Sequence, residues 1–315
     1  MTDLRIGVVG ATGVVGKVAL ELLAERGFAR VRAFASTRSA GRRVPYGERE
    51  LEVEEATPEA LAAGDLDLCF FSVGTETSRE LVPHAERAGA LCIDKSDAYR
   101  LADGIPLVVA GVNDGALEAV DARIVANPNC SAIQLACVLR PLQDAVGLTR
   151  VRLATYQAMS GAGDAAVEQL ERTAPGEADL GMDWELDGDE FSEEYKLRAE
   201  TRKILDLPDL PVHATCVRVP VRVGHAQAVW IQTQERISPE RARSILAAAP
   251  HIALEDLPTP RSAAGRDEVL VGRIREDSAD SGVALWIVCD NLRKGAALNA
   301  LQIAELLLAR SPLPA

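Results

Sequence analysis

The segment LRIGVVGATGVVGKVALELLAERG, from Leu4 to Gly27, indicates the architecture of the first half of the chain. Leu4–Val9 predicts a strand, and glycines follow it at positions 10, 13 and 16. From Val15 to Glu25 apolar residues recur every three to four positions, which predicts a helix that ends at Gly27. A strand, a glycine-rich turn and a helix in direct succession are typical of the opening of a doubly wound α/β domain.

The same alternation continues to about residue 130. A second strand is predicted over Arg30–Ala35, and the run Leu66–Ser72 lacks polar alternation, as expected for a strand buried on both faces. Further strand candidates are Leu91–Ile93, Leu107–Ala110 and Arg123–Ala126. This rhythm predicts an α/β fold with a Rossmann-like, doubly wound parallel sheet.

The second half has a different pattern, which predicts a second α+β domain. Helices are predicted over Ala132–Leu142, Gly161–Arg172 and Gly295–Arg310, and strands over Val151–Ala158, Thr215–Val223, Gln227–Thr233 and Val283–Cys289. The polar alternation of 215–223 and 227–233 favours an antiparallel sheet with one solvated face. The acidic stretch Gly176–Glu194 has few apolar residues, so we expect it to be a surface excursion.

Composition excludes several functional classes. The 315 residues are 48% hydrophobic and 26% charged, as in a globular protein. A net charge of −13 without a basic block argues against nucleic acid or an anionic membrane as the main partner. No apolar run reaches the roughly 18 residues of a membrane span. No signal peptide is evident at the start, so the expected compartment is the cytoplasm.

The six cysteines form no CxxC pair, and the four histidines show no metal-ligand spacing. We therefore expect no metal. Most of the cysteines lie in apolar runs and are expected to be small buried hydrophobic residues.

The glycines of the first turn suit nucleotide binding. Glycine allows the turn to be tight and lets backbone N–H groups approach a pyrophosphate at the helix N-terminus. A purely structural turn is the alternative.

The residues at the end of the second strand discriminate between NAD and NADP, because NAD proteins usually place an acid there. This chain has STRSAGRR at Ser36–Arg43 and no carboxylate between Glu25 and Glu48. Hydroxyls and Arg38 favour NADP, the alternative being a solvated basic loop.

Cys130 differs from the other cysteines by its position. It ends the sequence NPNC at Asn127–Cys130, between a predicted strand and a predicted helix. Unsatisfied N–H groups and the helix dipole favour a thiolate there, which is the state a nucleophile needs. Asn129 or nearby backbone N–H groups could stabilise an oxyanion. The alternative is an inert thiol in a capping turn.

With these motifs in place, the chain resembles the aspartate-semialdehyde dehydrogenase family of the bacterial NADP-dependent type over nearly its whole length. The resemblance rests on GATGVVG (Gly10–Gly16), FFSVGTETS (Phe70–Ser78), DKSDAYR (Asp94–Arg100), NPNCSAIQ (Asn127–Gln134), TYQAMSGAG (Thr155–Gly163), EEYKLRAETRKIL (Glu193–Leu205), TCVRVPVRVGHAQAV (Thr215–Val229) and DNLRKGAALNALQIAE (Asp290–Glu305).

The resemblance implies the reversible NADPH-dependent reduction of L-aspartyl-4-phosphate to L-aspartate-4-semialdehyde and phosphate. This reaction serves the biosynthesis of lysine and diaminopimelate, threonine, methionine and isoleucine. Cys130 would form a thioester, and His225, in the family's RxPVxxGH segment, would be the acid/base. An ordinary histidine pKa of about 6.5 would suit that work near neutral pH.

The remaining site residues also follow from the resemblance. Arg218 would bind the substrate α-carboxylate, Glu193 its amino group, and Gln157 would orient the acyl group. Arg218 and His225 are seven residues apart, so a continuous strand would point them to opposite faces and a bend must intervene. Phosphate would be bound by Arg100, Lys196 and Asn129. Without the family, Glu193 and Lys196 would be expected to form an exposed helical ion pair.

The resemblance also assigns cofactor contacts and domains. Expected NADP-binding residues are Gly10, Thr12, Gly13, Val14, Val15, Ser36, Arg38, Ser39, Ser160, Gly161 and Asn291. Residues 1–129 would form the NADP-binding Rossmann domain, completed by a C-terminal helix over 295–315. Residues 130–294 would form the catalytic and dimerisation domain of a homodimer.

Two alternatives are open at this point. N-acetyl-γ-glutamyl-phosphate reductase shares the fold logic and a catalytic cysteine, but its cysteine usually follows Pro-Gly, whereas Asn129 precedes Cys130 here. A non-catalytic paralogue would be expected to lack the nucleophile or the base, and both are present.

Overall fold

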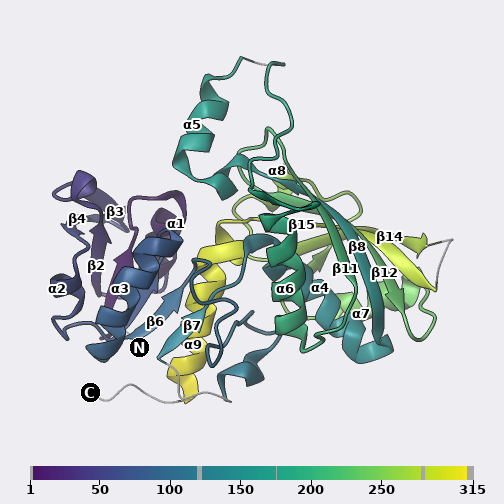
Figure 1. Ribbon diagram of the computed structural model, residues 1–315, viewed down its shortest axis with the longest axis horizontal. Helices are drawn as coiled ribbons and strands as arrows, with labels where there is room; N and C mark the ends of the chain where they lie inside the picture. The colour runs from purple at the N-terminus through teal and green to yellow at the C-terminus, as the bar shows by residue number, and fades with distance from the viewer. Residues whose placement is uncertain (1–2, 119–122, 175, 278–280, 311–315) are drawn as a thin grey trace. The chain divides into compact units, whose positions relative to one another are not determined.

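The computed structural model describes residues 3–118, 123–174, 176–277 and 281–310. The chain divides into two compact units, shown with their elements in Figure 1. The first unit comprises the chain up to Pro128 and the residues from Ala296 onward, and the second comprises Asn129–Gly295. Of the predicted C-terminal segment 295–315, the part 311–315 lies outside the described residues.

Within its described residues, the first unit holds one sheet of seven strands in the order β3-β4-β2-β1-β5-β6-β7. The strands are β1 (Arg5–Val9), β2 (Arg30–Ala35), β3 (Arg43–Tyr46), β4 (Arg49–Glu55), β5 (Leu68–Phe71), β6 (Leu91–Asp94) and β7 (Ile124–Ala126). Every neighbouring pair is parallel except β3 and β4. The strand order reverses at β1, between β2 and β5, which is the point where doubly wound sheets bind ligands. The predicted Rossmann-like sheet is confirmed.

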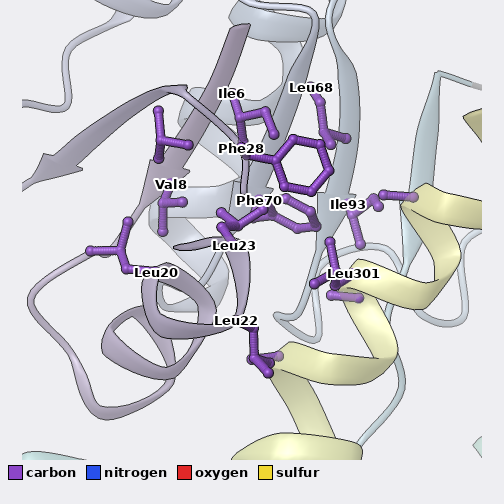
Figure 2. Packing of buried hydrophobic residues seen from close by; sticks show 14 of the residues in the cluster. Ile6, Val8, Leu20, Leu22, Leu23, Phe28, Leu68, Phe70, Ile93 and Leu301 are labelled. Atoms are coloured by element: carbon purple, nitrogen blue, oxygen red, sulfur yellow. The ribbon is translucent and has the colours of Figure 1, made fainter. Parts of the chain in front are cut away.

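Helices cover this sheet through apolar faces. They are α1 (Val14–Glu25), α2 (Pro58–Leu61), α3 (Thr75–Arg87) and α9 (Leu298–Arg310), with 3-10 turns η1 (Thr37–Ser39) and η2 (Asp114–Leu117). Figure 2 shows Leu20 and Leu23 of α1 and Leu301 of α9 in one buried cluster with strand residues such as Ile93. The last helix therefore belongs to the core of the first unit, although the second unit separates it from the rest in sequence.

Over the described residues, the second unit has a six-stranded mixed sheet in the order β11-β8-β12-β15-β14-β13. Its strands are β8 (Leu148–Gln157), β11 (Val212–Arg218), β12 (His225–Thr233), β13 (Ile252–Leu254), β14 (Val269–Asp277) and β15 (Gly282–Cys289), and a short hairpin pairs β9 (Leu186–Asp187) with β10 (Glu190–Phe191). Its helical elements are α4 (Cys130–Val146), η3 (Met159–Ala162), α5 (Asp164–Arg172), α6 (Ser192–Leu205), α7 (Pro239–Ala247) and α8 (Pro260–Ala263). A π-helical turn, η4 (Arg293–Ala297), leads into α9.

Two expectations from the sequence are wrong. Leu107–Ala110 is not a strand and makes only an isolated bridge, from Leu107 to Ala126. β11 runs parallel to β8 rather than antiparallel, because a long crossover that contains α6 connects them. The acidic stretch 176–194 lies mostly at the surface, as expected, but its last two residues, Glu193 and Glu194, are buried at the start of α6.

Among the helices within the described ranges, none has the length and apolar character that a membrane crossing requires.

Candidate active site

Cys130 is the first residue of α4, and the turn before it is held from two sides. The Asn129 side chain accepts a hydrogen bond from the Ser131 N–H at 2.8 Å, which caps the helix. The Asn129 N–H donates to Oε2 of Glu200 on α6 at 2.6 Å. The thiol therefore lies at the N-terminus of a long helix, where the dipole favours negative charge, as the sequence predicts.

The other five cysteines are buried, whereas Cys130 is half-buried, and all six lie in the described ranges. Burial raises the thiol pKa of Cys69 and Cys216 to about 12 and also raises that of Cys92, Cys137 and Cys289. The prediction that these five are small hydrophobic residues is confirmed. Of the six cysteines, Cys130 is therefore the candidate nucleophile.

His225 is the first residue of β12, and both of its ring nitrogens have partners. Nε2 lies 3.1 Å from the Cys130 sulfur, and Nδ1 accepts a hydrogen bond from the Ala158 N–H at 2.9 Å. The ring is fully buried, which lowers its pKa to about 3, and the charge of Arg218 acts in the same direction. The sequence led us to expect an ordinary pKa, so the structure differs here because the ring has no access to solvent.

Arg218 and His225 come from different strands, and both side chains lie close to Gly161. β11 ends at Arg218, β12 begins at His225, and β8 lies between the two strands, so the predicted bend is confirmed. A Cβ atom at Gly161 would lie 2.9 Å from both Arg218 Nη1 and His225 Nε2. Only glycine therefore lets the η3 backbone approach both side chains.

Glu193, Asn129 and Gln157 connect the cysteine turn to Arg218 through hydrogen bonds. Glu193 Oε1 accepts from Asn129 Nδ2 at 2.9 Å and from Gln157 Nε2 at 3.1 Å. Gln157 Oε1 in turn accepts from Arg218 Nη1 at 3.3 Å. The structure thus brings together Cys130, His225, Gln157, Arg218, Glu193 and Asn129. The exposed ion pair expected for Glu193 in the absence of the family is wrong, because its carboxylate is buried among these partners.

The two basic residues predicted to bind phosphate belong to different units. Lys196 is half-buried on α6, three residues after Glu193. Arg100 belongs to the first unit, where its guanidinium donates to the carbonyl groups of Asn127 and Lys95 and pairs with Asp97 at 2.7 Å.

Ser160 and Asn291 bond to one another in the second unit. Asn291 Nδ2 donates to Ser160 Oγ at 2.9 Å, and Asn291 Oδ1 accepts from the Gly224 N–H at 2.9 Å. Asn291 therefore fixes the backbone immediately before His225. Its predicted cofactor contact stays a prediction.

The glycine turn of the first unit lies at the switch point of the sheet. Gly10 has a φ of +89°, and a Cβ there would lie 2.2 Å from the carbonyl oxygen of Ser72. The turn continues through Thr12 and Gly13 to Val14 and Val15, the first residues of α1. Gly13 caps α1 without a side-chain hydrogen bond, so this N-terminus suits a pyrophosphate.

Ser36, Arg38 and Ser39 follow β2 beside this turn. Ser36 and Arg38 are exposed, and Ser39 Oγ lies 3.5 Å from Thr12 Oγ1. The segment that follows β2 contains no carboxylate of its own. The fold nevertheless brings one to it, because Glu55 of β4 pairs with Ala35 and accepts a hydrogen bond from Thr37. Because β4 lies twenty residues further along the chain, only the strand pairing reveals this neighbour.

Sequence reasoning also missed three residues in the second unit. Glu200 is buried and holds the Asn129 N–H. Asp183 Oδ1 lies 3.4 Å from Arg218 Nε, and the Arg218 guanidinium carbon lies 4.6 Å from the centre of the Trp184 ring. The available signal was a helical repeat, since Glu200 is seven residues after Glu193 and shares its face.

Two protein-family models match this chain, one in each of its two units. Residues 5–120 match the family model described as semialdehyde dehydrogenase, NAD binding domain, and residues 139–294 match semialdehyde dehydrogenase, dimerisation domain. The aspartate-semialdehyde dehydrogenase of Corynebacterium melassecola is 43% identical over 342 residues, which cover 96% of this chain and 99% of that protein.

Solved structures agree as well. Aspartate semialdehyde dehydrogenase II from Vibrio cholerae, complexed with ASA, has a TM-score of 0.92 and 38% identity over 99% of this chain and 100% of its own. Aspartate semialdehyde dehydrogenase with NADP from Candida albicans has a TM-score of 0.79 and 27% identity, over 98% and 99% of the two chains. The chain therefore belongs to the semialdehyde dehydrogenase family.

Proposed function

We propose that this protein is an aspartate-semialdehyde dehydrogenase, which reversibly reduces L-aspartyl-4-phosphate to L-aspartate-4-semialdehyde and phosphate with NADPH. The observation that carries the proposal is the 3.1 Å contact between Cys130 and His225 at the start of α4, beside Arg218 and Glu193. A nucleophile next to cationic and anionic side chains suits an acyl phosphate that carries an amino acid head group.

Cys130 is the nucleophile of this proposal. In the reductive direction its thiolate attacks the acyl carbon, phosphate leaves and a thioester forms on the protein. A bound nicotinamide cofactor supplies the hydride that reduces the thioester. The hemithioacetal then collapses to the aldehyde and free Cys130. His225, in contact with the sulfur, is the group that stabilises or transfers charge at the reacting atoms.

Arg218 binds the substrate α-carboxylate in this proposal. Its Nε is buried and has no hydrogen-bond partner among the described residues, although Asp183 lies within ion-pair distance. A buried donor without an acceptor suits a carboxylate ligand. Glu193 supplies the opposite charge for the amino group, and Gln157 orients the acyl group between the two.

Phosphate is the third group of the substrate. Lys196 lies on α6 with Glu193, and the Asn129 amide lies next to Cys130. We assign phosphate binding to these two residues and to Arg100 of the first unit.

The cofactor proposed for the first unit is NADP. The uncapped N-terminus of α1 and the close approach of the Gly10 backbone to Ser72 fit a pyrophosphate, with Thr12, Gly13, Val14 and Val15 forming the turn. Ser36, Arg38 and Ser39 suit the additional 2′-phosphate of NADP. Ser160, Gly161 and Asn291 are proposed to contact the cofactor from the second unit.

The proposed domain roles follow the family models. Residues 1–129 with the C-terminal helix bind the cofactor, and residues 130–294 carry catalysis and dimerisation. We propose a cytoplasmic homodimer that acts on a small-molecule substrate. No group of three or more His, Cys, Asp or Glu side chains suited to a metal ion occurs among the described residues.

The experiment that tests this function is phosphate-dependent oxidation of L-aspartate-4-semialdehyde by the full chain, followed as NADPH formation. We expect turnover, and we expect Cys130→Ala to reduce kcat by more than about 1000-fold. Cys137→Ala, at a buried position on the same helix, is the matched control and should retain most of the activity.

Two outcomes would contradict the proposal. Faster turnover of N-acetylglutamate semialdehyde would identify the alternative reductase. Absence of turnover with either aldehyde would identify a protein without this catalytic activity.

A further inference from the structure

The guanidinium of Arg218 is held at one corner and covered on one face. Its Nη1 donates to Gln157 Oε1 at 3.3 Å and to the carbonyl oxygen of Ala158 at 3.2 Å. Its guanidinium carbon lies over the ring of Trp184, 4.6 Å from the ring centre. Two acceptors at one corner do not by themselves fix the plane of the group. The ring face does, because it attracts a guanidinium that stacks on it.

Backbone hydrogen bonds hold the segment of Trp184 from both sides. Before it, Gly181 pairs with Arg218 itself, through two N–H to carbonyl bonds of 2.9 and 2.7 Å. After it, the carbonyl oxygen of Glu185 accepts from the N–H of Ser192, the first residue of α6, at 2.8 Å. The segment therefore connects the end of β11 to the beginning of α6, and Trp184 lies within it.

Trp184 has two ring contacts, and they indicate different roles. Its ring centre lies 6.5 Å from that of Phe191 on β10, which packs the segment against the β9–β10 hairpin. Its other contact is with Arg218, which carries the charge of the proposed carboxylate site. The first contact is sufficient to anchor a half-buried side chain, so the second is not needed for packing.

The Nε edge of Arg218, which we assign to the substrate, also faces Asp183. Arg218 Nε is buried and has no hydrogen-bond partner among the described residues, and Asp183 Oδ1 lies 3.4 Å away. The Asp183 carboxylate is thus near enough to pair with Nε, yet the guanidinium is not turned toward it for a hydrogen bond. A guanidinium able to tilt would be expected to complete that bond, since charge-assisted hydrogen bonds are the stronger ones.

We propose that Trp184 is a positioning residue, which fixes the plane of the Arg218 guanidinium so that its Nε edge stays available to the α-carboxylate of the substrate and is not drawn into a full ion pair with Asp183. This inference deepens the proposed function and rests on it for the identity of the carboxylate. The orientation matters because a planar guanidinium binds a carboxylate best through two parallel N–H bonds.

Replacement of Trp184 tests this role in the phosphate-dependent oxidation of L-aspartate-4-semialdehyde by the full chain. Trp184→Leu keeps an apolar side chain but removes the ring face, and we expect KM for the aldehyde to rise by about 5- to 10-fold. We expect kcat and the KM values for phosphate and NADP to stay within about 2-fold of the native values, because only uniform binding of the aldehyde is lost. Trp184→Phe keeps a ring face and should restore most of the native KM.

Two further variants separate this role from a structural one. Trp184→Met is a second ringless variant that fills more of the space beside Phe191, and it should show the same rise in KM for the aldehyde. Leu186→Ala is the matched control, because Leu186 is a large, exposed apolar residue on β9 of the same hairpin, and it should leave all KM values unchanged.

Three results would overturn the proposal. The first is an unchanged KM for the aldehyde in the ringless variants, and the second is a KM in Trp184→Phe as high as in Trp184→Leu. The third is an equal rise of the KM values for aldehyde, phosphate and NADP, which would show that Trp184 only stabilises the hairpin.

A double-mutant cycle tests whether Trp184 acts through Arg218. Without the ring, Asp183 should hold the guanidinium more strongly. Adding Asp183→Asn to Trp184→Leu should therefore lower KM for the aldehyde by a factor at least about 3-fold larger than the same change in the native chain. Equal factors in the two backgrounds would contradict the proposal. Absence of turnover by the unmodified chain would instead contradict the proposed function on which it rests.

Discussion

Glu200 accepts the backbone N–H of Asn129 at 2.6 Å, one residue before Cys130. The carboxylate is almost fully buried on α6, and it comes from a position 71 residues further along the chain. The same helix holds the Asn129 side chain through Glu193. α6 therefore fixes both the backbone and the side chain of the turn that presents the thiol.

Glu200→Gln should lower kcat by about 10-fold with little change in KM, because a neutral acceptor holds the Asn129 N–H less strongly than a carboxylate. Alkylation of Cys130 by iodoacetamide should slow in parallel. Glu168→Gln, at an exposed position on α5, is the control. A fall in melting temperature with unchanged alkylation and kcat would show that Glu200 only stabilises the fold.

Asp183→Asn should lower KM for aspartate semialdehyde. The Asp183 carboxylate lies 3.4 Å from Arg218 Nε, where we place the substrate carboxylate, so the two compete for one guanidinium. Because Asp183 is half-exposed, its pairing is worth at most about 1 kcal/mol, which corresponds to a decrease of about 5-fold or less. Asp189→Asn, at an exposed position nearby, should leave KM unchanged. A higher KM in Asp183→Asn would mean that Asp183 assists substrate binding.

The elements that the sequence predicted correctly are those with a strong local signal. The β1 turn and α1 follow from three glycines and a helical apolar repeat, and the exceptional position of Cys130 follows from the strand and helix around it. β3 and β4 were missed because Arg43–Glu55 is rich in charged residues and lies at the edge of the sheet. Glu200 was missed although it lies seven residues after Glu193 on the same helix face, because charged residues are rarely buried and are not expected in the interior.

The contacts around Arg218 could not be predicted for a different reason. Asp183 and Trp184 reach it because Gly181 pairs with Arg218 in an isolated bridge, and no local pattern specifies that pairing. The pKa of His225 likewise depends on burial by segments distant in sequence. The contacts of Arg218 and the pKa of His225 therefore depend on packing between segments distant in sequence, which local periodicity does not specify.

Acid should destabilise the native chain partly through His225. Its pKa is about 3 when folded and about 6.5 when unfolded, so between these values the unfolded state binds the extra proton. The free energy of unfolding should therefore fall by about 1.4 kcal/mol per pH unit from this residue as the pH drops below about 6.5. Urea unfolding of the native chain and of His225→Gln at several pH values isolates this contribution. Parallel pH dependence of the two proteins would show that His225 titrates normally.

Arg38→Ala should reduce the preference for NADP over NAD. Arg38 is an exposed cation after β2, whereas Glu55 of β4 pairs with Ala35 at the end of β2 and accepts a hydrogen bond from Thr37. The two side chains therefore bring opposite charges to this region. Loss of a charge-assisted contact with the 2′-phosphate should lower kcat/KM for NADP by about 10-fold and leave that for NAD nearly unchanged. Arg79→Ala, at an exposed ion pair on α3, is the control for a general loss of positive charge. Equal losses with both cofactors would place Arg38 outside the 2′-phosphate site, and a native chain that prefers NAD would show that Glu55 dominates there.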